Sequence, residues 1–443
     1  MINKIINKLK DQTIAILGFG REGQSTYKFI RKNLPNKHIT IIDQNDVSNN
    51  TLLSVDSNID IIFGKSYLDN LQNYDLVIKT PGISLKDIDT KAINITSEIE
   101  LLLEVDKENI IGVTGTKGKS TTSSLIYSII KSNNLPVLFA GNIGIPVFDL
   151  LDEITPETLI VIEMSSHQLE YLNISPHIGV VLNLYEDHLD HAGSVAHYHE
   201  IKMKMFANQT SSDYMVYCSD NDTLNNLVAK NKFKSRKNTV STKDPATIEK
   251  KGENVYYNNE VVFTTSLKRN LLGEHNFENI MVAYMVSKIL KLDDTKTLEA
   301  ISNFKPLEYR LEHFADINNV AYYVDTLATI PSATLEAINS IPNVNTLIFG
   351  GMDRGISYDG FAEALTKSNV EHFICMPTTG HVIGASLPKE RTYYVETLKE
   401  ASDLAKKITK PNTSCVLSPA AASYEHFKNY AEKGDKFKEY IQS

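Results

Sequence analysis

Two glycine-rich loops constrain what this chain can fold into more than any other feature. One spans residues 18–23 (GFGREG) and follows an apolar run at 13–17, and the other spans 112–119 (GVTGTKGK) and follows a second apolar run. Each loop leads into a helix-compatible segment, at 24–32 and 119–133. An apolar strand that enters a glycine turn and then a helix is the repeating unit of parallel sheets. The sequence therefore predicts an α/β fold with mostly parallel sheets.

The length of the chain and the grouping of its apolar runs indicate three domains. The 443 residues correspond to about three domains at roughly 150 residues each. We expect an N-terminal Rossmann-like domain over 1–104, a central domain like that of P-loop ATPases over 105–310, and a C-terminal Rossmann-like domain over 311–443. The predicted strands are 13–17, 39–42, 75–79, 110–113, 159–162, 178–182, 320–324, 346–349, 372–376 and 414–417.

Composition and charge argue against several classes of function. The chain carries 45 basic and 54 acidic side chains, and its net charge of −9 repels polyanions, so we expect no nucleic-acid partner. It has no run of about 18 apolar residues, and residues 1–8 lack the apolar core of a signal peptide, so we expect a cytoplasmic protein without a signal peptide or membrane insertion. Cys218, Cys375 and Cys415 lie far apart and are expected to be free thiols rather than a disulfide framework or a zinc site.

The second glycine-rich loop has the composition of a phosphate-binding loop. Its glycines allow backbone N–H groups to approach phosphate oxygens, and the following helix N-terminus adds a partial positive charge. Lys119 can reach the outer phosphates, and the Ser120 hydroxyl can bind Mg²⁺. The strict pattern would place glycine at position 113, where this chain has Val113, so the loop is a variant. The expected phosphate contacts are Gly115, Thr116, Lys117, Gly118, Lys119, Ser120 and Thr121.

The first glycine-rich loop, taken alone, fits more than one ligand. Gly18, Gly20 and Gly23 form a G-x-G-x-x-G pattern after a strand, and Asp43 follows 20 residues beyond Gly23. This pattern is typical of NAD-binding domains and by itself favours an oxidoreductase. Its geometry requires only a phosphate and a ribose-like hydroxyl, so other nucleotides fit as well. A nucleotide-binding module without catalysis is a further alternative.

Several motifs together resemble those of the Mur ligases, the ATP-dependent amide-forming enzymes of peptidoglycan synthesis. The loop from Gly115 to Ser120 resembles the phosphate loop of that family. The resemblance is strongest to the glutamate-adding members of the family, in segment 163–170 and in the C-terminal segments 417–423 and 433–437. The segments that carry the resemblance are 140–144 (AGNIG), 163–170 (EMSSHQLE), 183–191 (NLYEDHLDH), 273–279 (GEHNFEN), 417–423 (LSPAAAS) and 433–437 (KGDKF).

The resemblance implies a specific reaction in cell-wall biogenesis. An enzyme of this kind adds D-glutamate to UDP-N-acetylmuramoyl-L-alanine through an acyl phosphate, with ATP and Mg²⁺, and it is expected to be a monomer. The same ligation with L-glutamate is the main alternative. The second phosphate loop at Lys119 argues against the oxidoreductase, and Glu163 together with His188 argues against a non-catalytic module.

The resemblance also implies a catalytic set of Lys119, Glu163, His188 and Lys202. Glu163 ends an apolar strand near the expected phosphate loop, and His188 lies in a dense polar cluster, so both fit metal ligands. The spacing of Lys202 from Asp190 matches that of the lysine that the family carbamylates with CO₂. A carbamate needs a neutral amine, so burial or a nearby cation must lower the pKa of this lysine. The expected metal ligands are Ser120, Glu163, His188 and carbamylated Lys202.

Further binding residues follow from the same resemblance. For the UDP-sugar they are Gly18, Arg21, Glu22, Gly23, Asp43, Gly82, Asn142 and Ser165. For ATP, outside the loop, they are Asn276, Asn279, Arg310 and Asp325, and for the amino acid Thr329, Arg354, Ser423 and Tyr430.

The expected amino-acid pocket departs from the family pattern at three positions. Leu327 and Ile330 stand where the family has lysine and asparagine, and Arg354 stands where glutamate-adding enzymes usually have lysine. Arginine keeps the positive charge but presents a planar fork instead of a point ammonium. We therefore expect a reshaped pocket that still binds an acidic amino acid.

Overall fold

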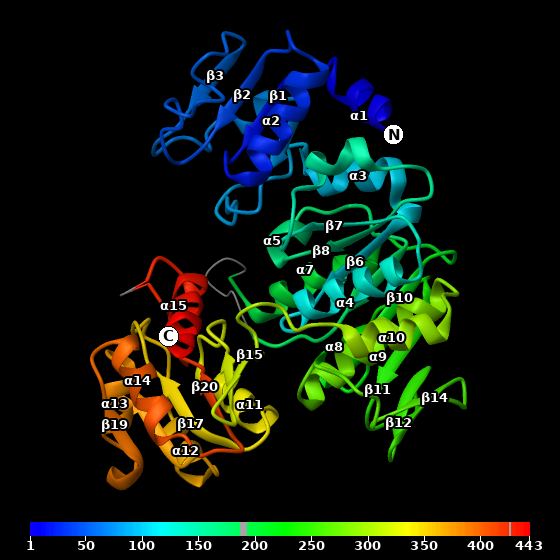
Figure 1. The fold of residues 1–443 in the computed structure, drawn as a ribbon. Helices are drawn as coiled ribbons and strands as arrows, with labels where there is room; N and C mark the ends of the chain where they lie inside the picture. Colours follow the sequence, from blue (N-terminus) through cyan, green and yellow to red (C-terminus); the bar gives the residue numbers. More distant parts are fainter. Residues whose placement is uncertain (187–192, 425–426) are drawn as a thin grey trace. The chain divides into compact units, whose positions relative to one another are not determined.

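The computed structural model describes residues 1–186, 193–424 and 427–443. The chain forms two compact units (Figure 1). The first contains residues 1–268 and 278–303, and the second contains 269–277 and 304–443. The described residues form three sheets, and most of their strand pairs are parallel. The prediction of an α/β fold with mostly parallel sheets is confirmed.

The first sheet is entirely parallel, with the strand order β3-β2-β1-β4-β5. Every residue of β1, β2 and β4 is buried, as expected for strands that are covered on both faces. In edge strand β3, half-buried residues alternate with exposed ones. Neither β3 nor the two-residue strand β5 was predicted from the sequence. The elements of this part are α1 (Ile2–Leu9), β1 (Ile14–Leu17), α2 (Arg21–Asn33), β2 (Ile39–Ile42), β3 (Ile59–Ile62), β4 (Leu76–Lys79), β5 (Ile95–Thr96) and α3 (Glu98–Asp106).

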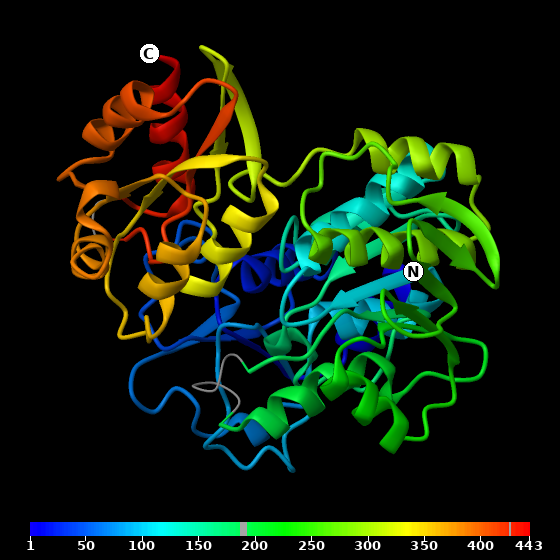
Figure 2. The same ribbon diagram turned by 90° about the horizontal axis from the view of Figure 1, so that it is seen from below.

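The second sheet also belongs to the first unit and has the order β14-β13-β12-β11-β10-β9-β6-β8-β7. Its strands are parallel from β7 to β12, and β12, β13 and β14 are antiparallel. Helix α10 packs beside α4 (Figures 1 and 2). The strands are β6 (Ile110–Thr114), β7 (Val137–Gly141), β8 (Leu159–Glu163), β9 (Ile178–Val181), β10 (Tyr214–Cys218), β11 (Arg236–Ser241), β12 (Ile248–Lys251), β13 (Asn254–Tyr257) and β14 (Glu260–Thr264). The helices are α4 (Lys119–Ser132), α5 (Ser166–Leu169), α7 (Val195–Ala207), α8 (Asp222–Lys230), α9 (Glu274–Ile289) and α10 (Asp294–Asn303).

The third sheet lies in the second unit, with the order β15-β16-β20-β17-β18-β19, and only β15 is antiparallel to its neighbour. Alternate residues of β17 enter two different hydrophobic clusters: Leu347 packs with α11, α12 and α13, and Ile348 packs with α14 and α15. Helices therefore cover both faces. The elements are β15 (Glu312–Ile317), β16 (Val320–Val324), α11 (Pro331–Ser340), β17 (Val344–Phe349), α12 (Phe361–Lys367), β18 (His372–Cys375), α13 (Thr379–Gly384), β19 (Thr392–Tyr394), α14 (Leu398–Ile408), β20 (Thr413–Leu417) and α15 (Tyr430–Gln442).

This architecture brings polar loops to the carboxyl ends of parallel strands, where ligands bind in α/β sheets. Both glycine-rich loops lie there, after β1 and after β6. Among the described residues, no helix combines the length and the apolar character needed to cross a bilayer.

Candidate active site

The phosphate loop follows β6 and ends where α4 begins at Lys119. Gly118 is the N-cap residue of this helix and has a φ of +85°, a left-handed conformation that glycine tolerates best. A Cβ atom at this position would lie 2.7 Å from Oδ1 of Asn279 on α9. The predicted residue Asn279 therefore lies directly against the phosphate loop. Asn276 precedes it by one turn of α9 and is buried, and its side-chain amide donates to the Leu272 carbonyl.

A neighbouring segment holds the loop in shape. The backbone N–H of Lys117 donates to Oδ1 of Asn183 at 2.8 Å, and Nδ2 of Asn183 donates to the Lys117 carbonyl at 3.1 Å. The backbone N–H of Thr116 donates to the Asn183 carbonyl at 3.0 Å. Asn183 is not among the predicted site residues, although it is the first residue of the family-like segment 183–191.

Two lysine ammonium groups converge on the first residue of this loop. Nζ of Lys119 donates to the carbonyls of Gly115 and Thr116, each at 3.0 Å. Nζ of Lys202, from α7, donates to the same Gly115 carbonyl at 3.0 Å. Lys202 is 1% exposed, and its Nζ lies 4.8 Å from the centre of the Tyr198 ring. Burial and a second cation nearby are the conditions that favour a neutral amine.

Glu163 has the properties of a metal ligand. It is the last residue of β8 and is fully buried, beside Val113 of β6. One carboxylate oxygen, Oε1, accepts a hydrogen bond from Nδ2 of Asn142 at 2.6 Å. The other oxygen, Oε2, is buried and has no hydrogen-bond partner in the described part of the chain. A buried carboxylate oxygen is unfavourable unless a cation or donor binds it, so this residue fits a magnesium site. The predicted ligand His188 and its neighbour Asp190 lie outside the described residues.

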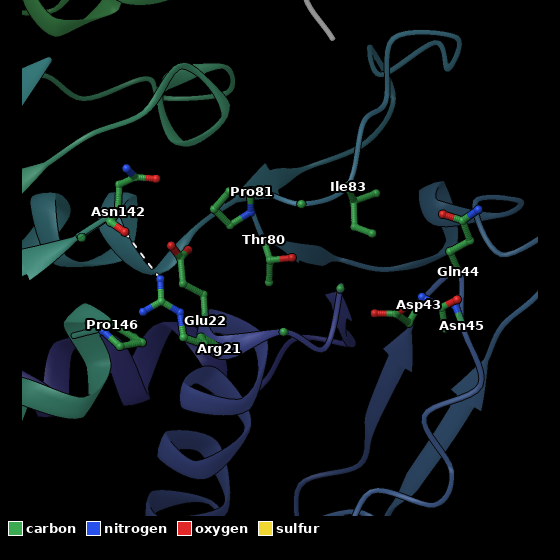
Figure 3. Close-up of a pocket in the computed structure, with 14 residues that line it drawn as sticks. Arg21, Glu22, Asp43, Gln44, Asn45, Thr80, Pro81, Ile83, Asn142 and Pro146 are labelled. Atoms are coloured by element: carbon green, nitrogen blue, oxygen red, sulfur yellow. Dashed lines mark hydrogen bonds between the residues drawn. The ribbon is translucent and has the colours of Figure 1, made fainter. Parts of the chain in front are cut away.

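A second site lies at the carboxyl ends of β1, β2 and β4. It is a cavity of about 390 Å³ that is also bordered by the loop after β7 (Figure 3). Its described lining does not include the predicted residues Gly23 and Ser165; Ser165 instead caps α5 by accepting from the backbone N–H of Gln168. The lining residues are Gly18, Gly20, Arg21, Glu22, Asp43, Gln44, Asn45, Thr80, Pro81, Gly82, Ile83, Gly141, Asn142 and Pro146.

The polar side chains of this cavity are held by their neighbours. Asp43 accepts from the backbone N–H groups of Phe19 at 2.8 Å and Asn45 at 2.9 Å, so it fixes the first glycine-rich loop. Arg21 donates to the Asn142 carbonyl at 3.5 Å (Figure 3) and to the Gly144 carbonyl at 3.3 Å.

Burial shifts the pKa values of a lining residue, Glu22, and of the nearby Lys79. Burial raises the pKa of Glu22, although the hydrogen bond from Gln168 opposes the shift. Burial also lowers the pKa of the nearby Lys79 to about 8, against the attraction of Glu170. Glu22 therefore gains a proton more readily than an exposed glutamate does.

In the second unit, the predicted residues gather at the carboxyl ends of the adjacent strands β16, β20 and β17. Asp325 follows β16 and is 4% exposed. Its oxygens accept from the Leu311 backbone N–H at 3.1 Å and from the Ser418 hydroxyl at 2.9 Å, and burial raises its pKa to about 7. Arg310 directly precedes Leu311, and its Nε atom is buried without a hydrogen-bond partner among the described residues.

The predicted amino-acid residues differ in exposure. Arg354 is exposed in the loop after β17, and Tyr430 is 41% exposed at the start of α15. Thr329 is half-buried after β16. The Ser423 hydroxyl is buried with no described hydrogen-bond partner. An arginine and three hydroxyl groups at one sheet edge can bind a small molecule with carboxylates.

Lys433 is a buried lysine in the same unit and is not among the residues predicted from the sequence. It is 1% exposed, and its Nζ donates to the Gly350 carbonyl at 2.9 Å, at the root of the loop that carries Arg354. Burial lowers the pKa of Lys433 to about 7.

The buried Lys433 predicts a pH-dependent stability. Between about pH 7 and pH 10.5 the unfolded chain binds a proton on this lysine that the folded chain does not, so the free energy of unfolding rises with pH. The contribution is at most about 1.4 kcal/mol per pH unit. Chemical denaturation at pH 7.5 and 9.5 should show a smaller rise for Lys433→Met than for the wild type. An equal rise in the free energy of unfolding for both proteins would contradict the lowered pKa of Lys433.

Comparison with known proteins finds one family throughout the chain. Residues 12–101 match the MurD-like N-terminal domain of Mur ligases, and residues 113–287 match the Mur ligase middle domain. The UDP-N-acetylmuramoylalanine–D-glutamate ligase of Clostridium kluyveri is 32% identical over 410 residues, which cover 87% of this chain and 86% of that protein. The ligase of the same name from Citrifermentans bemidjiense is 29% identical over 455 residues and covers 98% of both chains.

Solved structures show the same fold. The UDP-N-acetylmuramate-alanine ligase of Thermotoga maritima superposes with a TM-score of 0.62 at 20% identity, over 97% of this chain and 99% of that chain. The MurF ligase of Thermotoga maritima, solved in complex with ADP, has a TM-score of 0.62 at 16% identity, over 98% of this chain and 95% of that chain.

Proposed function

The chain belongs to the Mur ligase family, whose members are ATP-dependent ligases, and we propose that it joins D-glutamate to UDP-N-acetylmuramoyl-L-alanine. One observation carries the proposal: a single unit holds both a phosphate loop and a separate cavity at a glycine-rich loop. The first suits ATP and the second suits the diphosphate of a nucleotide-sugar. The G-x-G-x-x-G loop lies within the residues that match the Mur ligase N-terminal domain, so we assign it to UDP rather than to NAD.

The chemistry requires activation of the acceptor carboxylate, because a carboxylate oxygen is a poor leaving group. The carboxylate attacks the γ-phosphorus of ATP, which gives an acyl phosphate and releases ADP. The amine of glutamate then attacks the acyl carbon; phosphate leaves, the amine loses a proton, and an amide remains. We propose that Lys119 and the backbone N–H groups of 115–121 bind the phosphates and offset the charge on the transferred group.

The proposed metal site uses residues whose local surroundings suit it. Bound magnesium would neutralise phosphate oxygens and help to orient them. Ser120, Glu163, His188 and carbamylated Lys202 would hold it, and the buried free oxygen of Glu163 supports this assignment. Carbamylation joins the neutral amine of Lys202 to CO₂ and releases a proton, which converts a cation into an anion. The burial of Lys202 beside Lys119 favours the neutral amine that this step needs.

We assign the remaining sites to three domains. Residues 1–104 would bind the UDP part of the acceptor, through Gly18, Arg21, Glu22, Gly23, Asp43 and Gly82, with Asn142 and Ser165 from the central domain. Residues 105–310 would bind ATP, including Asn276, Asn279 and Arg310. Residues 311–443 would contribute Asp325 to ATP, and Thr329, Arg354, Ser423 and Tyr430 to glutamate.

Amino-acid specificity provides the direct test. Phosphate release should require both the acceptor and an amino acid, and D-glutamate should be the preferred substrate in a panel that includes L-glutamate, aspartate, alanine and lysine. A strong preference for L-glutamate would overturn the stereochemical assignment, and a preference for alanine or lysine would overturn the acidic pocket.

Arg354→Ala should weaken glutamate binding selectively. Loss of one charge-assisted hydrogen bond should raise the KM for glutamate by roughly 10- to 100-fold and leave the KM for ATP nearly unchanged. Lys399→Ala is the control, because Lys399 is an exposed cation on α14 that pairs with Asp403. Equal KM changes for glutamate and ATP would contradict the role of Arg354.

A further inference from the structure

Asn142 lies between the two sites of the first unit. It borders the nucleotide-sugar cavity in the loop after β7 (Figure 3). Its side-chain Nδ2 also donates to Oε1 of Glu163 at 2.6 Å, and its backbone N–H donates to the Glu163 carbonyl at 3.0 Å. Asn142 therefore contacts Glu163 twice, once at its buried carboxylate and once at its backbone carbonyl. Family resemblance assigns Asn142 only to the acceptor substrate.

The side-chain hydrogen bond determines which way the Glu163 carboxylate faces. The terminal torsion of glutamate is broad, so a carboxylate without a partner can rotate. Here a short, charge-assisted hydrogen bond engages Oε1, and Oε2 is left without a partner among the described residues. Because the residue is fully buried, water cannot take the place of that partner freely.

The loop that carries Asn142 is itself held in place. Gly141 pairs with Glu163 in the register of β7 and β8, and it has a φ of +103°. A Cβ atom at Gly141 would lie 2.3 Å from the Glu163 carbonyl oxygen, so the two strands approach closely at this point. Arg21 binds the carbonyls of Asn142 and Gly144 from the other side. Asn142 is thus placed by both backbone and side-chain contacts.

We propose that Asn142 is a positioning residue for the metal site: its amide fixes the Glu163 carboxylate so that Oε2 is presented to magnesium. The proposal depends on the proposed function in one respect: ATP-dependent ligation uses magnesium, and Glu163 would bind that ion. Hydrogen bonds to metal-binding carboxylates orient them, and removal of such partners typically lowers metal affinity by about 10- to 100-fold.

The test measures metal binding without turnover. Mn²⁺ replaces magnesium, and free Mn²⁺ is measured by electron paramagnetic resonance during titration of the full chain with saturating ADP. Asn142→Leu keeps the branched shape of the side chain but has no donor, and Asn142→Ala removes both the shape and the donor. Each should raise the Kd for Mn²⁺ about tenfold or more. Asn109→Ala is the matched control, because Nδ2 of Asn109 also binds a carboxylate, that of Asp106, and it should leave the Kd within about twofold.

A double variant separates positioning from general loss of structure. If Asn142 acts through Glu163, Asn142→Leu should have little further effect on Mn²⁺ binding in a Glu163→Gln background. Unchanged Mn²⁺ affinity in Asn142→Leu, or additive losses in the double variant, would overturn the proposal. A wild-type chain that binds no Mn²⁺ with ADP would overturn it as well. Because neither acceptor nor glutamate is present, an error in the proposed substrates would appear only in the product assay and would leave these titrations unaffected.

Discussion

Lys119→Ala is expected to reduce phosphate release by roughly a thousandfold or more, which in practice abolishes turnover. In the structure, Nζ of Lys119 lies within the phosphate loop and donates to the carbonyls of Gly115 and Thr116. When ATP is bound, the same ammonium can turn to the outer phosphates and offset the charge that develops during transfer. Steady-state phosphate release with saturating acceptor and D-glutamate measures the loss.

The matched control for this prediction is Lys131→Ala. Lys131 lies in the last turn of the same helix, α4, and its Nζ donates to the Tyr127 hydroxyl at 3.5 Å. The Lys131→Ala variant should keep near-normal phosphate release. Thermal unfolding of both variants should remain close to that of the wild type. A folded Lys119→Ala protein with near-normal phosphate release would show that the loop does not bind ATP.

Ser120→Ala should have a milder effect than Lys119→Ala. It should raise the Mg²⁺ concentration needed for activity rather than abolish the reaction.

Lys202→Ala is expected to lose at least about a hundredfold in activity, because a carbamate at this position would supply a negative charge to the magnesium site. A small carboxylic acid such as acetate should partly restore activity by occupying the space of the missing carbamate. Wild-type activity should also rise with added bicarbonate if the carbamate is incompletely formed. Phosphate-release assays with and without these additions measure both effects.

Lys204→Ala provides the comparison for Lys202. Lys204 lies on the same helix, α7, is half-buried, and donates to the Glu170 carbonyl at 2.5 Å. It should retain most of the activity and should not respond to acetate. Rescue by acetate distinguishes a missing carbamate from a loss of packing, because a general packing defect would not be repaired by a carboxylate. Full activity of Lys202→Ala would remove this lysine from the mechanism.

The sequence alone located most of the parallel strands and both glycine-rich loops. The predicted strands 39–42, 110–113 and 159–162 lie within β2, β6 and β8, and the helix predicted from residue 119 begins there as α4. These features depend on local properties: continuous apolar runs for strands buried on both faces, and glycine where the chain must turn tightly. The family motifs added the expected site residues.

Sequence reasoning missed some strands that are partly buried or short, and it also missed the mostly buried β10. Strands β3 and β19 are at sheet edges, and β5 contains only two residues, so none of them gives a continuous apolar run. The helix predicted from residue 24 begins at Arg21 instead, because the first glycine-rich loop ends at Gly20, the N-cap residue of α2.

Only the tertiary structure decided which side chains meet. Asn142 and Glu163 are 21 positions apart, Asn183 and Lys117 are 66 apart, and Lys433 and Gly350 are 83 apart. No local period relates these pairs. The first two contacts depend on the order and register of β7, β8, β6 and β9, and the third depends on the packing of α15 beside the end of β17. Burial likewise arises only when the sheets and helices pack. Burial lowers the pKa of Lys433, and it leaves one oxygen of Glu163 without a hydrogen-bond partner among the described residues. The sequence therefore determined the order of the α/β units and the residue types at the site, whereas packing determined their partners and their charge, because hydrogen bonding and desolvation depend on neighbours that are distant in the chain.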